Sequence, residues 1–94
     1  MPLISDKLRA LRHLYGYSQE YVSLKLGQSQ PSYSKFENGK VLPKIDTLER
    51  MSQLYDLPLA DIIAKTSTEL VAQVVANPDF IKLAGGEEGE TTAE

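Results

Sequence analysis

The sequence predicts an all-α fold, because three features repeat along its 94 residues. Apolar residues recur at intervals of three and four, which is the period of an amphipathic helix. Residues that start a helix, such as Ser18 and Ser29, and residues that end one, such as Gly16, stand between these stretches. No segment alternates apolar and polar residues over the length of a strand, and no tight turn joins two β-branched runs.

The first two helices are short and separated by a glycine. Apolar residues at positions 4, 8, 11 and 15 predict a first helix, which Gly16 ends. The basic residues of this stretch fall on its other side: Lys7, Arg9 and Arg12. Ser18 is expected to cap a second helix of about eight residues, which Gly27 stops.

The third helix begins almost immediately after the second. Ser29 is a second candidate cap, and Pro31 is tolerated in the first turn because the N–H it lacks would be unpaired there. Tyr33 and Phe36 lie three apart and are expected to point inward, and the helix closes at residues 38–39. Residues 40–43 then form an extended connection, because the residue before a proline avoids the helical region.

Two further helices complete the expected domain of residues 3–65. The apolar stripe from Ile45 to Tyr55 predicts the fourth helix, whose start is poorly marked because Lys44 cannot cap it. Asp46 with Glu49 can form a capping box there instead. Pro58 opens a short fifth helix with three inward residues, Leu59, Ile62 and Ile63.

The C-terminal part is an extension, residues 66–84, followed by an acidic tail, residues 85–94, which is expected to be disordered. Thr66 and Glu69 match a capping box for a sixth helix, and Phe80 belongs to a short amphipathic piece after it. The sixth helix carries an apolar stripe of Leu70, Val71, Val74 and Val75. Because 65 residues are expected to complete a core, the stripe is interpreted as a dimerisation surface; the alternative is that it covers the chain's own core.

Composition excludes several classes of function. The chain has no cysteine and one histidine, His13, so thiol chemistry is excluded and we expect neither a metal site nor a cofactor. No nucleophile–base pair is visible, so an enzyme is not expected. The unbroken apolar runs are no longer than three residues, which predicts a cytoplasmic protein without a membrane span or a secretion signal.

The charge is unevenly divided along the chain. Residues 1–65 carry nine Lys or Arg and seven Asp or Glu, a net charge of +2, and residues 66–94 carry one Lys and six acids, a net charge of −5. The acidic overall balance therefore does not exclude an anionic partner for the first part. A charge of only +2 argues against indiscriminate binding of nucleic acid.

Two short helices joined by a tight turn form a helix-turn-helix unit. Around them stand the motifs Leu8-Arg9-Ala10-Leu11-Arg12, Gly16-Tyr17-Ser18-Gln19-Glu20, Leu26-Gly27-Gln28-Ser29 and Phe36-Glu37-Asn38-Gly39-Lys40. In this combination the chain resembles the phage repressor and Cro (Xre-like) type of helix-turn-helix domain over about residues 3–65. The resemblance implies a five-helix, lambda-repressor-like fold, to which this chain adds a C-terminal helix.

The resemblance also assigns roles to residues of the third helix and its surroundings. It implies that five residues face bases or adjacent phosphates: Ser29, Gln30, Pro31, Ser34 and Lys35. It implies that Gln19, Asn38 and Lys40 hold the DNA backbone, and Lys44, a departure from the family pattern, adds a candidate phosphate contact. Pro31 is a second departure, which limits readout at that position to apolar contact. A third is the small Ser23, which keeps the second and third helices close.

The sequence predicts a transcriptional regulator that binds double-stranded DNA sequence-specifically. Repression is the favoured mode of action, by a homodimer on a palindromic operator. It reads the major groove with the third helix, about residues 30–38. The alternative is an antitoxin or anti-repressor whose main role is to bind a partner protein. The cluster of Lys35, Lys40 and Lys44 favours DNA.

Overall fold

The computed structural model describes residues 3–80, and helix is the regular structure throughout that range. The six helices are α1 (Ile4–Tyr15), α2 (Gln19–Lys25), α3 (Gln30–Glu37), α4 (Ile45–Tyr55), α5 (Leu59–Ala64) and α6 (Ser67–Ala76). The predicted all-α fold, five helices with one more at the C-terminal side, is confirmed. The rest of the expected amphipathic piece, residues 81–84, and the expected tail, residues 85–94, lie outside the described residues.

Local capping signals fix most helix ends where the sequence places them. Gly16 ends α1 with a φ of 76°, in the left-handed region. The side chains of Ser18 and Ser29 accept hydrogen bonds from the first turns of α2 and α3. Thr66 and Glu69 form the predicted capping box at the start of α6.

The start of α4 differs from the prediction. Lys44 occupies the N-cap, in an extended conformation and without a side-chain hydrogen bond to the helix. The predicted capping box of Asp46 with Glu49 is therefore not formed, and this prediction is wrong. The chain reaches Lys44 already extended through Pro43, so that the helix begins directly afterwards and Asp46 lies inside its first turn. An acid is favourable there because the helix dipole is positive at its start.

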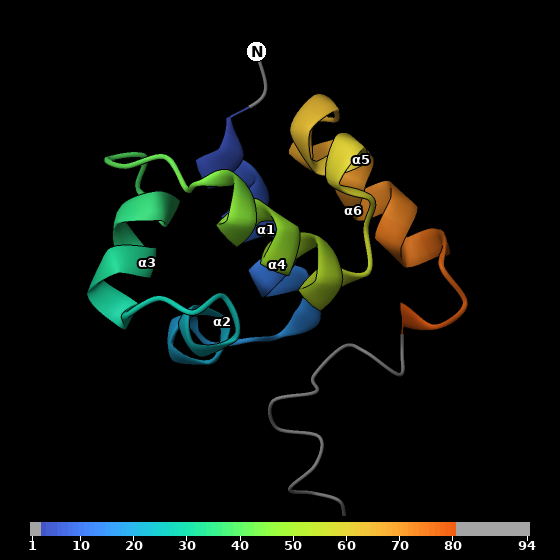
Figure 1. Ribbon diagram of the computed structural model, residues 1–94. Coiled ribbons are helices and arrows are strands. Elements are labelled where there is room, and N and C mark those ends of the chain that lie inside the picture. The colour runs from blue at the N-terminus through green and yellow to red at the C-terminus, as the bar shows by residue number, and fades with distance from the viewer. Residues whose placement is uncertain (1–2, 81–94) are drawn as a thin grey trace, which may run out of the picture.

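The helices surround one apolar core. Figure 1 shows α1 and α4 at the centre of the view, with α2 and α3 on one side and α5 and α6 on the other. Every helix contributes at least one buried apolar side chain, among them Leu11, Val22, Tyr33, Met51, Ile62 and Leu70. No described helix is longer than the 12 residues of α1, and none within residues 3–80 has the length and apolar character to cross a membrane.

Tyrosines form much of this core, as expected for Tyr15, Tyr33 and Tyr55. The rings of Tyr15 and Tyr55 lie 5.0 Å apart, and the Tyr15 hydroxyl donates to the backbone oxygen of Tyr55 at 3.0 Å. Tyr17 is buried beside them. These side chains are packing elements rather than stacking platforms for nucleic-acid bases.

The helix α6 is part of the same core. It packs against α1, and the side chains of Leu70 and Val74 are fully enclosed by their own chain. The sequence predicted both residues on a dimer surface. That prediction is wrong for Leu70 and Val74, because their side chains are buried where α6 covers the apolar face of α1. Val71 is half-buried, and Val75 points outward with 53% of its surface exposed.

Two further side chains depart from the expected pattern. Lys7 is buried, and its Nζ donates to the backbone oxygens of Ile62 at 2.5 Å and Ile63 at 3.0 Å. These carbonyls belong to the last turn of α5, where intrahelical partners are missing. Burial lowers the pKa of Lys7 below its usual value. Ile63 was expected to point inward but is exposed, because the single buried position of the six-residue α5 is Ile62.

Candidate nucleic-acid interface

Helices α2 and α3 form a helix-turn-helix unit with a tight turn at residues 26–28. Gly27 has a φ of 72°, which ends α2 and redirects the chain. The N–H of Gln28 donates to the backbone oxygen of Ser23 at 2.8 Å, which closes the turn. Ser23 is buried, and its small side chain donates to the backbone oxygen of Glu20, so that the two helices pack closely.

The orientation of α3 is set by its aromatic side. Tyr33 and Phe36 are buried with their rings edge to face, as the sequence predicts. The opposite side is therefore turned to solvent. Of the five predicted base-facing residues, Ser29, Gln30, Pro31 and Lys35 are exposed and Ser34 is half-buried. The fold brings them together at the start and along the outer side of one short helix.

The predicted backbone-contacting residues fall into two places. Gln19 is the first residue of α2, is half-buried, and its amide donates to Glu37 Oε1 at 3.0 Å. Asn38, Lys40 and Lys44 are exposed and follow α3 along the connection to α4. The side chain of Asn38 accepts a hydrogen bond from the N–H of Lys40, which shapes the first bend of that connection.

A groove of about 450 Å³ runs between α3 and the start of α4. Lys35 and Lys44 line it together with Gln28 and Ser32, two residues that were not among the predicted contacts. Ser32 is one turn after Ser29 and shares a hydroxyl–hydroxyl hydrogen bond with it at 3.0 Å. Its spacing of three from both Ser29 and Lys35 was the signal that would have identified it.

A buried carboxylate holds the unit together from inside. Glu37, the last residue of α3, has only 3% of its surface exposed. Arg12 on α1 donates to both of its oxygens, Nε to Oε2 at 2.6 Å and Nη2 to Oε1 at 3.1 Å. The Tyr33 hydroxyl and the Gln19 amide also donate to this carboxylate. Helices α1, α2 and α3 therefore meet at one charged group.

The ionisation of these groups follows from their surroundings. Burial by itself would raise the pKa of Glu37, but the hydrogen bonds from Arg12, Tyr33 and Gln19 outweigh it and lower the pKa below its usual value. Burial, followed by the hydrogen bond to Glu37, raises the pKa of the Tyr33 hydroxyl. At neutral pH the carboxylate is therefore charged and the tyrosine remains a donor.

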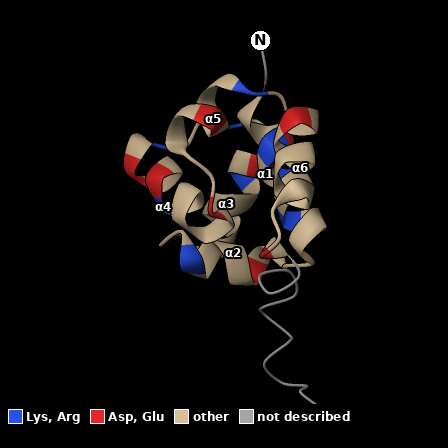
Figure 2. Ribbon diagram, turned by 90° about the vertical axis from the view of Figure 1, so that its right-hand side faces the viewer, with Lys and Arg blue, Asp and Glu red and all other residues tan. Residues whose placement is uncertain are grey.

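The basic residues of α1 serve the fold. Arg9 pairs with Asp6 and also donates to the backbone oxygen of Glu37, while Arg12 is engaged with the Glu37 side chain. Basic and acidic segments are interspersed among the helices in Figure 2, which agrees with the small net charge of the first 65 residues. Among the exposed cations, Lys35 lies on α3, Lys40 and Lys44 follow it, and the Arg50 guanidinium lies beside Gly27 in the turn before it.

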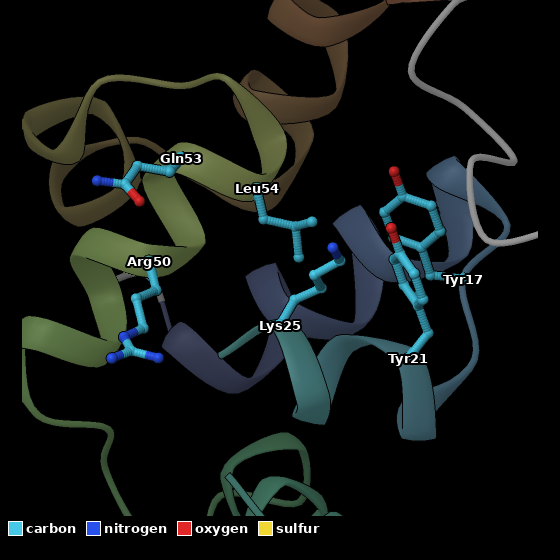
Figure 3. Close-up of a pocket in the computed structure, with 6 residues that line it drawn as sticks. All are labelled: Tyr17, Tyr21, Lys25, Arg50, Gln53 and Leu54. Atoms are coloured by element: carbon cyan, nitrogen blue, oxygen red, sulfur yellow. The ribbon is translucent and has the colours of Figure 1, made fainter. Parts of the chain in front are cut away.

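A second, more open cleft lies between α2 and α4 (Figure 3). It is lined by Tyr17, Tyr21, Lys25, Arg50, Gln53 and Leu54. The Lys25 ammonium lies 5.5 Å from the centre of the Tyr21 ring, a cation–π contact. Lys25 and Arg50 give this cleft a positively charged lining.

Comparison with known proteins agrees with this geometry. The sequence matches the helix-turn-helix family over residues 8–62. It is 29% identical over 68 residues to the cryptic phage CTXphi transcriptional repressor RstR of Vibrio cholerae, an alignment that covers 72% of this chain and 61% of RstR.

Two further relatives are named as regulators of transcription. A helix-turn-helix regulatory protein of Pyrococcus furiosus is 30% identical over 73 residues, covering 78% of this chain and 23% of that protein. The SPbeta prophage-derived regulator YonR of Bacillus subtilis is 25% identical over 83 residues, covering 88% of this chain and 77% of YonR. The chain thus spans less than two thirds of the first two relatives. No solved structure matches it.

Proposed function

The chain belongs to the phage-repressor and Cro type of the helix-turn-helix family, and from that premise we propose that it represses transcription by binding a specific DNA duplex. One observation carries the proposal. Polar and basic side chains are exposed on the outer side of α3, while Tyr33 and Phe36 anchor its inner side in the core. The major groove of B-DNA, about 12 Å wide, admits one such helix.

The exposed side chains of α3 supply the sequence-reading contacts. Gln30 can donate to and accept from adenine in a bidentate pair, and Lys35 can donate to the acceptors of guanine. Pro31 offers only apolar surface, which suits a thymine methyl group. The hydroxyls of Ser29 and Ser34 can donate to either a base or a phosphate, so they adapt to the register that Gln30 and Lys35 set.

The DNA backbone is held at the two ends of the unit. Gln19 is the first residue of α2, where the positive end of the helix dipole suits a phosphate. Asn38, Lys40 and Lys44 follow α3, so that they reach phosphates beyond the opposite end of the helix. These backbone contacts position the protein on the duplex, and the side chains of α3 recognise the base sequence.

The modest charge favours a dimer on a two-fold operator. One recognition helix reads a few base pairs, and a domain of net charge +2 gains little from general attraction to phosphate. Two domains on one duplex, with half-sites one helical turn or about 34 Å apart, supply the missing affinity. The operator is therefore expected to be a palindrome.

Selection of binding sequences from random duplex DNA tests the proposal. We expect a palindromic sequence to be enriched, and its affinity to fall as the salt concentration is raised. A matched selection uses the Gln30→Ala, Lys35→Ala double variant, which changes two exposed side chains and should lose the enrichment. If the wild-type chain enriches no sequence, repression through this surface is excluded and a protein partner becomes the better account.

A further inference from the structure

The cleft between α2 and α4 carries two cations that no acid of the described residues neutralises. Its volume is about 570 Å³, and neither Asp nor Glu is among the residues that line it. Lys25 and Arg50 are exposed, and neither takes part in an ion pair within residues 3–80. The cleft therefore presents positive charge that is open to an anionic group.

The remainder of the cleft is partly aromatic. In the view of Figure 3 the rings of Tyr17 and Tyr21 lie at one end, Arg50 at the other, and Lys25 between them. The two rings are 4.6 Å apart, and the Lys25 ammonium is 5.5 Å from the centre of the Tyr21 ring. A guanidinium binds a carboxylate in a bidentate pair, and the rings offer apolar surface to the stem of the same side chain. The lining therefore suits glutamate.

The described part of the chain ends beside the same aromatic group. The ring of Phe80 lies 5.5 Å from that of Tyr15, edge to face. Tyr15 in turn lies 5.4 Å from Tyr17, which lines the cleft. The chain that continues from Phe80 therefore starts near the tyrosine end of the cleft.

That continuation is acidic and long enough to reach the cations. Residues 81–94 carry one lysine and four glutamates, a net charge of −3. Three of the glutamates fall within four positions: Glu87, Glu88 and Glu90. The first is seven positions beyond Phe80, and seven residues of extended chain span up to about 25 Å. This exceeds the four steps of 4.6–5.5 Å that lead through the ring centres from Phe80 to the Lys25 ammonium.

We propose that the acidic segment, residues 85–94, docks in the cleft between α2 and α4, where its glutamates pair with Lys25 and Arg50. The segment has no large apolar residue, so that charge is the contact open to it. A single exposed ion pair is weak, but the segment is tethered to the domain that it binds. Tethering gives it an effective concentration on the order of 1 mM, so a millimolar affinity is enough to populate the docked state.

The groove beside α3 is a weaker candidate for the same segment. Its cations, Lys35 and Lys44, share the groove with the carboxylate of Asp46. In Figure 1, α3 and α6 lie on opposite sides of α1 and α4, and the chain reaches Phe80 after α6. The segment therefore has farther to go to that groove, and it meets an acid there.

Docking also bears on DNA binding, a consequence that rests on the proposed function. A Cβ at Gly27 would lie 2.5 Å from Nη1 of Arg50, which places the guanidinium beside the turn that precedes α3. Glutamates paired with Arg50 therefore put negative charge next to the start of the DNA-facing helix. There they repel the phosphates of a duplex, so that the docked segment competes with DNA.

Zero-length cross-linking of the 94-residue chain without DNA tests the docking. A carbodiimide joins a lysine amine to a carboxylate only where the two touch, and mass spectrometry of the digested chain identifies the linked residues. The glutamates of the segment should link to Lys25 at least about fivefold more than to Lys35, an exposed lysine on α3. Arg50→Gln should lower the Lys25 yield about twofold or more, and its matched control Lys44→Gln should leave the yield unchanged.

Three outcomes would overturn the docking: equal yields at Lys25 and Lys35, a Lys25 yield unaffected by Arg50→Gln, or links formed only between two copies of the chain. These readouts need no DNA, so they fail separately from the selection that tests the function.

Duplex titrations at low salt test the competition with DNA. The triple variant Glu87→Gln, Glu88→Gln, Glu90→Gln changes no residue of the described core and should bind about threefold more tightly than the wild type. In an Arg50→Gln background the same triple change should gain less than about 1.5-fold. Equal gains in the two backgrounds would show that the segment acts through its overall charge and not through the cleft, which would overturn the competition.

Discussion

Arg12 on α1 and Glu37 at the end of α3 form a bidentate ion pair, 25 positions apart in sequence, with Nε–Oε2 at 2.6 Å and Nη2–Oε1 at 3.1 Å. The pair fixes the end of α3 to α1. A buried pair of this kind stabilises less than its Coulomb energy suggests, because both charges lose water. Its consequence is positional: α3 and the start of α2 are held to one carboxylate.

The first prediction concerns acid. The folded-state pKa of Glu37 lies below its usual value of about 4.5, so its contribution to stability is complete above that value and is lost as the pH falls through the folded-state pKa. Glu37→Gln removes this titration. Thermal unfolding followed by circular dichroism should show a melting temperature that falls more steeply below pH 5 in the wild type than in the variant. Parallel curves would show that Glu37 is not the titrating group.

A second prediction compares two buried tyrosine hydroxyls. The Tyr33 hydroxyl donates to the Glu37 carboxylate, whereas the Tyr55 hydroxyl has no hydrogen-bond partner among the described residues. Tyr33→Phe should therefore cost about 1.5–3 kcal/mol of unfolding free energy, the range for a hydrogen bond to a charged group. Tyr55→Phe should change it by less than about 0.5 kcal/mol or stabilise the protein. Urea unfolding measures both, and equal losses would contradict the assignment.

Features that depend on neighbours in sequence were predictable. Gly16, Ser29 and the Thr66–Glu69 box act within one turn of their own position, so the helix ends follow from the sequence. The same holds for the outer side of α3. Once Tyr33 and Phe36 are recognised as inward residues, helical periodicity places Lys35 outward, whereas Gln30 is exposed as the first residue of the helix.

Features that depend on distant segments were not predictable. Lysine is usually exposed to solvent. Lys7 is buried because its ammonium donates to the backbone oxygens at the end of α5, a segment far away in sequence. Glu37 is a charged residue next to Asn38, and only the approach of Arg12 from α1 makes its burial tolerable. Leu70 has the same local pattern whether it covers its own core or a second chain. The packing of α6 against α1 shows that Leu70 covers the core of its own chain.

A third prediction concerns the turn between α2 and α3. A Cβ at Gly27 would lie 2.5 Å from Nη1 of Arg50, but this is the end of a flexible side chain that can move aside. The cost of Gly27→Ala therefore comes from its φ of 72° and should be about 1–2 kcal/mol. Gly16→Ala is the matched control, with a φ of 76° and no atom within 4 Å. Chemical denaturation should show similar losses of unfolding free energy for the two variants. A much larger loss for Gly27→Ala would mean that the Arg50 side chain cannot move aside.

A fourth prediction tests the place of α6 in the core. Leu70→Ala removes an enclosed side chain and should cost about 2–5 kcal/mol of unfolding free energy. Val75→Ala, on the exposed side of the same helix, should cost less than about 0.5 kcal/mol. Truncation after Lys65 removes Leu70 and Val74 together and should leave a chain that is largely unfolded. A cooperative melting transition in the truncated chain would show instead that residues 3–65 form a complete core.

The last prediction separates the two kinds of DNA contact on the operator obtained by selection. Gln30 is exposed at the start of α3, and Gln30→Ala should cost about 1–3 kcal/mol on that operator and reduce discrimination at one base pair. Lys40 is exposed after the end of α3, and Lys40→Ala should weaken binding to all duplexes about equally. It should also lower the slope of log K against log salt by about one, because one fewer counterion is released. Titrations of both variants on operator and random duplexes, at several salt concentrations, measure these effects. Identical behaviour of the two variants would show that Gln30 and Lys40 do not divide base reading from backbone contact.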